Sequence, residues 1–222
     1  MRRRDARQTA IFSDFNGTIT DRDTLPTLLE AYGLREAVDR TNDARATGVL
    51  NHRERIAAQA RALTQSIEEA AATLNSIVRF DAGFTRLQAA CAHDGIALTV
   101  LSSGLEQLIR PMLRRHGCDA IALVANEAEP RSDGWRVRFR DTSPHGCAKQ
   151  SYLERARRRG MRTVAIGDDE SDFEMAAVAD LCFAKRESAL QAYLRGTDRT
   201  HYAYATFDDV IEQLASLGIL RA

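Results

Sequence analysis

The stretch Ile11-Phe12-Ser13-Asp14-Phe15-Asn16-Gly17-Thr18-Ile19-Thr20 decides the fold of this chain. It starts with a short apolar run and then reaches an aspartate and an Asn-Gly pair, a pattern typical of a buried strand that leads into a tight loop. Asp14 would then stand at the carboxyl end of the strand, where open α/β sheets bind their ligands. On this stretch alone, an ordinary aspartate in an Asn-Gly turn is the alternative.

Composition favours a soluble globular protein, because 44% of the 222 residues are hydrophobic and 28% are charged. The 31 Lys and Arg residues balance the 31 Asp and Glu residues, so we expect neither a nucleic-acid nor a membrane partner. Arg2–Arg4 read as a solvated tail, since no long apolar segment precedes Asp14, and we expect a cytoplasmic protein. The four cysteines are widely separated and form no CxxC pair, which predicts neither a zinc site nor a disulfide framework.

The order of apolar and polar segments predicts an α/β fold. A first helical pattern covers residues 25–32 and ends at Gly33, and a second covers residues 35–78, with one apolar face formed by Ile56, Ala60, Leu63, Ile67, Ala71 and Leu74. From residue 84 onward, short buried strands alternate with helices; the predicted strands are 96–101, 120–124, 163–166, 181–183 and 202–204, with a hairpin at 132–139. Such alternation predicts a doubly wound, parallel, Rossmann-like sheet, so we expect a core (1–22 and 84–222) with an inserted helical cap (23–83).

Three predicted strands end in groups suited to phosphate chemistry: Asp14 on the first, Ser102-Ser103-Gly104 on the second, and Asp168 and Asp172 on the fourth. The carboxyl ends of parallel strands meet at one edge of the sheet, so we expect these groups to converge. Lys149 lies near the start of a predicted helix between them. As alternatives, Ser102 caps a strand, Lys149 lies on a helix surface, and Asp172 interacts with a helix dipole.

The converging groups suggest a mechanism. Carboxylates from two strands can hold Mg²⁺, which prefers oxygen ligands. Ser102 and the backbone N–H groups of Ser103 and Gly104 can bind phosphoryl oxygens, and Lys149 can offset their charge. Asp14 can attack phosphorus and form an aspartyl-phosphate.

These residues resemble, in order, the four motifs of the haloacid dehalogenase superfamily phosphatases: Asp14-Phe15-Asn16-Gly17-Thr18, Ser102, Lys149 and Gly167–Asp172. The resemblance covers nearly the whole chain, and the helical insertion resembles that superfamily's four-helix cap. Three further segments are most similar to the phosphoserine-phosphatase-like group, and especially to the methionine-salvage phosphatases of 2-hydroxy-3-keto-5-methylthiopentenyl-1-phosphate: Arg110–Leu113, Asn126–Ala128 and Phe183–Lys185.

The resemblance implies a role for each residue. Asp14 is the nucleophile and, with Asp168 and the backbone carbonyl of Asn16, a magnesium ligand. Thr18 and Ser102 position the phosphate, Lys149 neutralises charge, and Asp172 either joins the metal shell or holds Lys149. Asp169 stands where the family usually has glycine, and either alters the loop backbone or adds charge near the metal.

Asn16 is the larger departure, because the family normally has a second aspartate there that protonates the leaving oxygen and activates water. An amide can do neither, so we expect magnesium and phosphate binding to survive while turnover drops. Three explanations stay open: an engineered substitution that traps a complex, a natural variant of low activity, or a protein whose phospho-aspartate persists.

The sequence therefore predicts a magnesium-dependent phosphatase of a small phosphorylated metabolite. A phosphotransferase and a non-catalytic phospho-ligand-binding module are the alternatives. Apolar faces on the cap helices could also pair in a homodimer. Substrate identity stays open, since the cap selects it.

Overall fold

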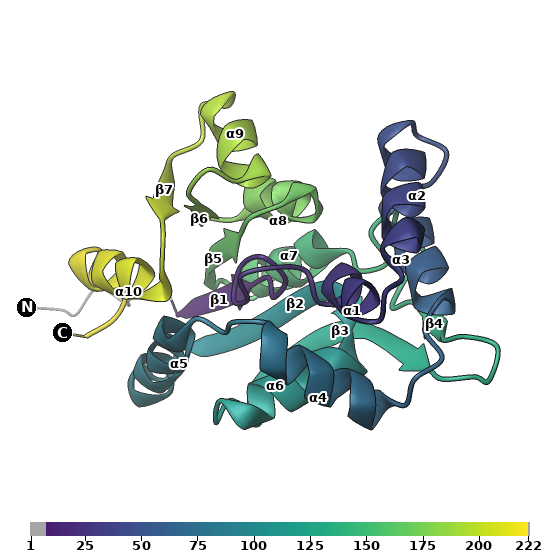
Figure 1. Cartoon of the computed structure of the whole chain (residues 1–222). Coiled ribbons are helices and arrows are strands. Elements are labelled where there is room, and N and C mark those ends of the chain that lie inside the picture. Colours follow the sequence, from purple (N-terminus) through teal and green to yellow (C-terminus); the bar gives the residue numbers. More distant parts are fainter. Residues whose placement is uncertain (1–7, 222) are drawn as a thin grey trace, which may run out of the picture. The chain divides into compact units, whose positions relative to one another are not determined.

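The computed structural model describes residues 8–221, and the predicted tail Arg2–Arg4 lies outside them. The described residues contain the strands β1 (Thr9–Ser13), β2 (Ala97–Leu105), β3 (Ala122–Glu129), β4 (Arg136–Arg138), β5 (Arg162–Gly167), β6 (Leu181–Lys185) and β7 (His201–Tyr204). Their order in the sheet is β4-β3-β2-β1-β5-β6-β7 (Figure 1). The β1–β2, β1–β5, β5–β6 and β6–β7 pairs are parallel, and β3–β4 is antiparallel. The predicted α/β fold with a mostly parallel sheet is confirmed.

The helices of the described residues are α1 (Thr24–Ala31), α2 (Arg35–Ala46), α3 (His52–Arg61), α4 (Ile67–Ile77), α5 (Ala82–Asp94), α6 (Glu106–Arg115), α7 (Lys149–Arg158), α8 (Phe173–Val178), α9 (Ala189–Arg195) and α10 (Phe207–Ser216), with a 3₁₀-helix, η1 (Glu170–Asp172). Over residues 8–221, none of them has both the length and the apolar character needed to cross a membrane.

The chain folds as two compact units. The first unit contains the described residues up to Asp14, Asp81–Val100 and the residues from Lys149 onward. The second contains Phe15–Phe80 and Leu101–Ala148, so β2 contributes to both. The division into a core of 1–22 and 84–222 and a cap of 23–83 stays a prediction.

In the first unit, β1 is buried because Ala10, Ile11 and Phe12 are all apolar. It pairs in parallel with β2 on one side and with β5 on the other. At the start of α5, one carboxylate oxygen of Asp81 accepts from the N–H of Gly83 and the other from the N–H of Phe207 in α10. Side chains of both helices also pack together, since the Phe84 and Phe207 rings meet edge-on at 5.1 Å. The sheet edge that carries Asp14 thus belongs to a well-packed unit.

In the second unit, the predicted helical segment of residues 35–78 is divided among three helices. New helices begin where Asn51 and Ser66 form capping boxes with Glu54 and Glu69, because each side chain accepts from a backbone N–H of the first turn. Of the six predicted face residues, five are buried: Ile56, Ala60, Leu63, Ala71 and Leu74. The predicted face is therefore assembled from α3, α4 and the segment between them.

β2 and β3 continue furthest past the ends that the apolar pattern predicted. β2 does not end before Ser102 but continues to Leu105, and Asn126 of β3 donates from Nδ2 to the Ser103 carbonyl at 2.7 Å. β3 continues to Glu129 because the predicted hairpin pairs its last residues with β4. Small and polar residues lie within these strands because partner strands satisfy their backbone groups.

The β3–β4 hairpin is joined to the segment around α3 through Trp135. Its backbone N–H is shared by the carbonyls of Ala60 and Leu63, and its indole Nε1 donates to the Gln65 carbonyl at 2.9 Å. The preceding Gly134 has a φ of 109°, and a Cβ at this position would collide with the Arg61 carbonyl oxygen. Only glycine fits this approach of two backbones.

Replacing Gly134 with alanine is expected to lower the free energy of unfolding by about 3 kcal/mol or more, because backbone strain and the clash with Arg61 add together. The matched control is Gly160→Ala, at a φ of 79° with no atom within 4 Å of a Cβ, which should cost only about 1–2 kcal/mol. Urea unfolding of the two variants measures the difference. Equal losses would show that the hairpin contact is unimportant.

Candidate active site

Asp14 directly follows β1, as the sequence predicted. Its backbone N–H donates to the Ile166 carbonyl of β5 at 2.9 Å, and the Ser13 hydroxyl donates to the Asp14 carbonyl oxygen at 2.8 Å. These bonds fix the backbone on both sides of its Cα. Asp14 is only 4% exposed, so its carboxylate needs partners within the protein in place of bulk water.

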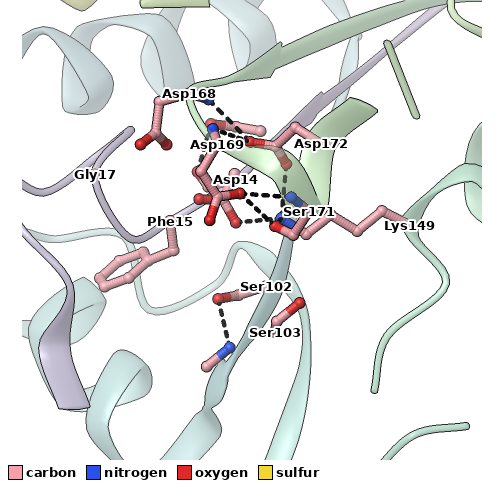
Figure 2. Close-up of polar contacts among 12 residues, drawn as sticks. Asp14, Phe15, Gly17, Ser102, Ser103, Lys149, Asp168, Asp169, Ser171 and Asp172 are labelled. Carbon is pink, nitrogen blue, oxygen red and sulfur yellow. Dashed lines mark hydrogen bonds and ion pairs between the residues drawn. The ribbon is translucent and has the colours of Figure 1, made fainter. Parts of the chain in front are cut away.

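Lys149, the first residue of α7, meets this carboxylate. Its side chain is 1% exposed, which excludes the helix-surface alternative. The ammonium Nζ donates three hydrogen bonds (Figure 2), to Asp14 Oδ1 at 2.6 Å, Asp172 Oδ1 at 2.7 Å and Ser171 Oγ at 2.9 Å. An ammonium has three protons, so every donor of Lys149 has an acceptor.

The loop after β5 folds back on itself and delivers the other acidic groups. Asp172 Oδ2 accepts from the N–H groups of Asp168 at 2.9 Å and Asp169 at 3.3 Å, while its Oδ1 faces Lys149. At Gly167 a Cβ would collide with the Asp172 carboxylate, so glycine is required there. Asp172 therefore holds both the lysine and the loop.

The charges in this cluster do not balance. The Asp14 carboxylate has one ammonium, that of Lys149, and three other carboxylates, those of Asp168, Asp169 and Asp172, as charged neighbours. Burial, followed by repulsion from its acidic neighbours, raises the pKa of Asp14 well above its ordinary value, although Lys149 opposes this. Burial also raises the pKa of Asp172. For Lys149, burial alone would lower the pKa, but attraction to Asp14 and Asp172 outweighs it and the pKa is raised.

The cluster fits a hard divalent cation. One carboxylate oxygen from each of Asp14, Asp168 and Asp172 lies within 4.8 Å of the other two. Oxygen ligands and an excess of negative charge suit Mg²⁺, which is usually held by one or two carboxylates and keeps several waters. The three residues, which the sequence placed at the ends of two different strands, are thus brought together by the fold.

Asn16 and Thr18 belong to the second unit. The Asn16 Oδ1 accepts from the backbone N–H of Thr24 at 3.0 Å, the first residue of α1. Its Nδ2 packs closely on Gly104, where a Cβ would lie 2.8 Å away. Thr18 is fully buried. The Asn16 side chain therefore makes a structural bond to the start of α1. The metal contact of the Asn16 carbonyl and the phosphate contact of Thr18 stay predictions.

Ser102, Ser103 and Gly104 form the end of β2 in the second unit. The Ser102 hydroxyl accepts from the Gly104 N–H at 3.0 Å, and Ser102 is fully buried. In the β1–β2 register, Val100 pairs with Ser13, so Ser102 follows two residues further along its strand. Phosphate binding by these residues stays a prediction.

Two polar residues were not given a role in the mechanism predicted from the sequence. Ser171 accepts from Lys149, and Asp169 Oδ1 accepts from both the Ser171 N–H at 2.8 Å and its hydroxyl at 2.7 Å. The Asp-x-Ser spacing is typical of an aspartate that caps a short helix. The contact with Lys149 has no such local pattern, because it joins residues 22 positions apart.

Comparison with known proteins then identifies the family. The family model described as haloacid dehalogenase-like hydrolase matches residues 11–177. The chain belongs to this family. The match includes Asp14, Lys149, Asp168 and Asp172, which the fold has gathered in one cluster.

Relatives of this haloacid dehalogenase-like hydrolase span almost its full length. It is 28% identical to Pdp3-interacting factor 1 of Schizosaccharomyces pombe, covering 95% of this chain and 96% of the relative. It is 24% identical to the polyol phosphate phosphatase PYP1 of Saccharomyces cerevisiae (92% and 91% covered). It is 27% identical to the 2-hydroxy-3-keto-5-methylthiopentenyl-1-phosphate phosphatase of Geobacillus thermodenitrificans (96% and 99% covered).

Among solved structures, a substrate-bound phosphoserine phosphatase is similar in fold to this hydrolase. The TM-score is 0.74 at 18% identity, with 94% of this chain and 99% of the other covered. A phospho-aspartyl intermediate analogue of phosphoserine phosphatase matches with a TM-score of 0.70 at 19% identity, over 93% and 99% of the two chains. At these identities the likeness concerns the fold.

Adding Mg²⁺ is expected to raise the melting temperature, because the cation offsets the repulsion among Asp14, Asp168 and Asp172. At a hundredfold excess over its Kd, the gain is about 2.7 kcal/mol, or about 5–10 °C for a chain of this size. Asp168→Asn should remove most of this shift, whereas Glu174→Gln, an exposed acid on α8, should keep it. A full magnesium shift in Asp168→Asn would contradict the assignment.

Lys149→Met is expected to cost about 3–5 kcal/mol near neutral pH, since it leaves two buried carboxylates without their cation. Without Lys149, the pKa values of Asp14 and Asp172 in the folded state rise further above their unfolded values. A carboxyl with a raised pKa opposes folding increasingly as pH rises, so the loss should be larger at pH 8 than at pH 5.

Urea unfolding at both pH values measures this effect. Lys185→Met provides the control, because Lys149 and Lys185 are the only lysines of the sequence. A loss that does not change between pH 5 and pH 8 would show that the buried carboxylates are not its cause.

Proposed function

We propose that this hydrolase is a magnesium-dependent phosphatase of a small phosphorylated metabolite and works through an aspartyl-phosphate on Asp14. The observation that carries the proposal is the buried Asp14 carboxylate, 2.6 Å from Lys149 Nζ and grouped with Asp168 and Asp172. A nucleophilic carboxylate with a cation beside it and a metal-binding acidic cluster is what phosphoryl transfer requires.

In this mechanism, Asp14 attacks phosphorus, a new O–P bond forms, and the ester P–O bond breaks; the leaving oxygen takes its proton from water and departs as an alcohol. Water then attacks the phosphorus of the aspartyl-phosphate, which breaks the Asp14 O–P bond and releases inorganic phosphate and the free carboxylate. Lys149 stabilises negative charge on the phosphoryl group, and Asp172 keeps Lys149 in place through its 2.7 Å ion pair. Ser102, Ser103, Gly104 and Thr18 are proposed to bind the phosphoryl oxygens. Asp14, Asp168, Asp172 and the Asn16 carbonyl are proposed to hold Mg²⁺, which when bound polarises the phosphoryl oxygens.

Asn16 limits turnover in this proposal. The leaving alcohol needs a proton and the second step needs a base, and the amide of Asn16 supplies neither. Its Oδ1 already accepts from Thr24 N–H. An aspartyl-phosphate on Asp14 should therefore form slowly and persist.

The same residue favours a second candidate, a phosphotransferase. If water is not activated beside Asp14, an alcohol or sugar hydroxyl can take the phosphoryl group instead. Added acceptors should then speed the loss of phosphate from Asp14, and their failure to do so would contradict this candidate.

Tight ligand binding by calorimetry, with Asn16→Asp still inactive, would instead favour a phospho-ligand-binding module.

Two relatives' names suggest substrate classes for this chain: polyol phosphates and 2-hydroxy-3-keto-5-methylthiopentenyl-1-phosphate. Both are phosphate esters of small polar molecules. We propose the helical segment 23–83 as the cap that selects among them, because exposed arginines such as Arg35, Arg40 and Arg61 offer cations for a second anionic group.

Asn16→Asp is expected to raise hydrolysis by ~10²–10⁴-fold, because it restores a general acid and base beside the nucleophile. Hydrolysis of para-nitrophenyl phosphate and of a panel of phosphorylated metabolites, with magnesium present, measures the gain. Asn16→Ala is the control, since it removes the bond to Thr24 but adds no acid. Inactivity of Asn16→Asp on the whole panel would overturn the phosphatase proposal.

A further inference from the structure

Asp169, the residue in the position where the family usually has glycine, takes part in a continuous chain of hydrogen bonds. Its Oδ1 accepts from the Ser171 hydroxyl at 2.7 Å, and that hydroxyl accepts from Lys149 Nζ at 2.9 Å. Lys149 in turn donates to Asp14 Oδ1 at 2.6 Å. Figure 2 shows the side chains of Asp169, Ser171 and Lys149 beside the Asp14 carboxylate.

The direction of each bond follows from the proton count. An ammonium has only donors and an ionised carboxylate only acceptors, whereas a hydroxyl has one proton and two lone pairs. The Ser171 proton must therefore point to Asp169, which leaves a lone pair facing Lys149. Without Asp169, the hydroxyl loses the acceptor that fixes its rotation.

We propose that Asp169 is a positioning residue: through the Ser171 hydroxyl it orients the Lys149 ammonium toward the Asp14 carboxylate. The inference rests on the proposed function, in which Lys149 neutralises charge on the phosphoryl group.

Because Lys149 is buried, its hydrogen bond to the Ser171 hydroxyl affects how its ammonium is oriented. Lys149 and Ser171 are both buried, so water does not readily replace a lost acceptor. The carboxylates of Asp14 and Asp172 attract the ammonium, but two acceptors leave it free to turn about the line between them. The Ser171 hydroxyl, which Asp169 holds in place, removes this freedom. One N–H of the Lys149 ammonium then stays directed at the Asp14 carboxylate.

A purely structural role for Asp169 is the competing explanation. Its Oδ1 also accepts from the Ser171 backbone N–H at 2.8 Å and so caps η1. Replacing Ser171 with alanine keeps this N–H and removes only the hydroxyl. The two roles can therefore be separated in a double-mutant cycle.

The experiment measures the ammonium protons of Lys149 by NMR on protein labelled with ¹⁵N-lysine. Only two lysines contribute signals, and Lys185→Arg assigns them. Asp169→Ala is expected to speed exchange of the Lys149 ammonium protons with water about tenfold, the effect of losing one buried hydrogen bond. Asp169→Asn keeps an acceptor oxygen and should restore most of the protection, while Lys185 stays unchanged in both.

Ser171→Ala should speed exchange as much as Asp169→Ala, and adding Asp169→Ala to it should change little. If Asp169→Ala speeds exchange of the Lys149 ammonium protons as much in the Ser171→Ala protein as in the wild type, Asp169 acts through the loop backbone alone. That result would overturn the proposal. Unchanged exchange in Asp169→Ala, or equal exchange in the alanine and asparagine variants, would overturn it too.

A kinetic readout complements the exchange measurement. In the Asn16→Asp chain, Asp169→Ala should lower kcat about tenfold with little change in KM, since the ammonium acts on charge that develops during reaction. The NMR measurement needs neither substrate nor metal. Failure of the phosphatase proposal and failure of this inference are therefore distinguishable.

Discussion

The buried ammonium of Lys149 is the interaction on which the rest of the site depends. A charge that is 1% exposed is tolerated only when it is paired and fully hydrogen-bonded, and Lys149 meets this condition through Asp14, Asp172 and Ser171. The parallel register of β1 and β5 brings Asp14, at the end of β1, beside the loop after β5 that carries Ser171 and Asp172. The first turn of α7 then supplies the cation.

The same arrangement leaves the cluster with more negative charge than one lysine can offset. Burial raises the pKa of Asp14 and Asp172, and repulsion from acidic neighbours adds to this, so the folded protein holds these carboxylates at a cost in stability. A divalent cation bound among Asp14, Asp168 and Asp172 would relieve that cost. The proposed metal binding would therefore be coupled to stability through the same three side chains.

In the proposed mechanism, Asn16 separates phosphate binding from proton transfer. Charge neutralisation there depends on Lys149 and on the cation that the acidic cluster would hold, whereas proton transfer would need an acid or base two positions after Asp14. The amide keeps a structural bond to the start of α1 and carries no useful proton. Under the proposed function, the site is thus better equipped to bind a phosphate ester than to turn it over.

The sequence by itself determined the α/β class, the placement of Asp14 after the first strand and the family, because apolar periodicity and ordered motifs are local signals. It indicated Asp14, Lys149, Asp168 and Asp172 as candidate site residues. It assigned no contact to Ser171 and left the effect of Asp169 undecided. Tertiary structure alone decided that β2 continues to Leu105, since strand length depends on a partner distant in sequence. It also decided the direction of the Ser171 hydroxyl, because a hydroxyl turns toward whichever donors and acceptors the fold brings to it.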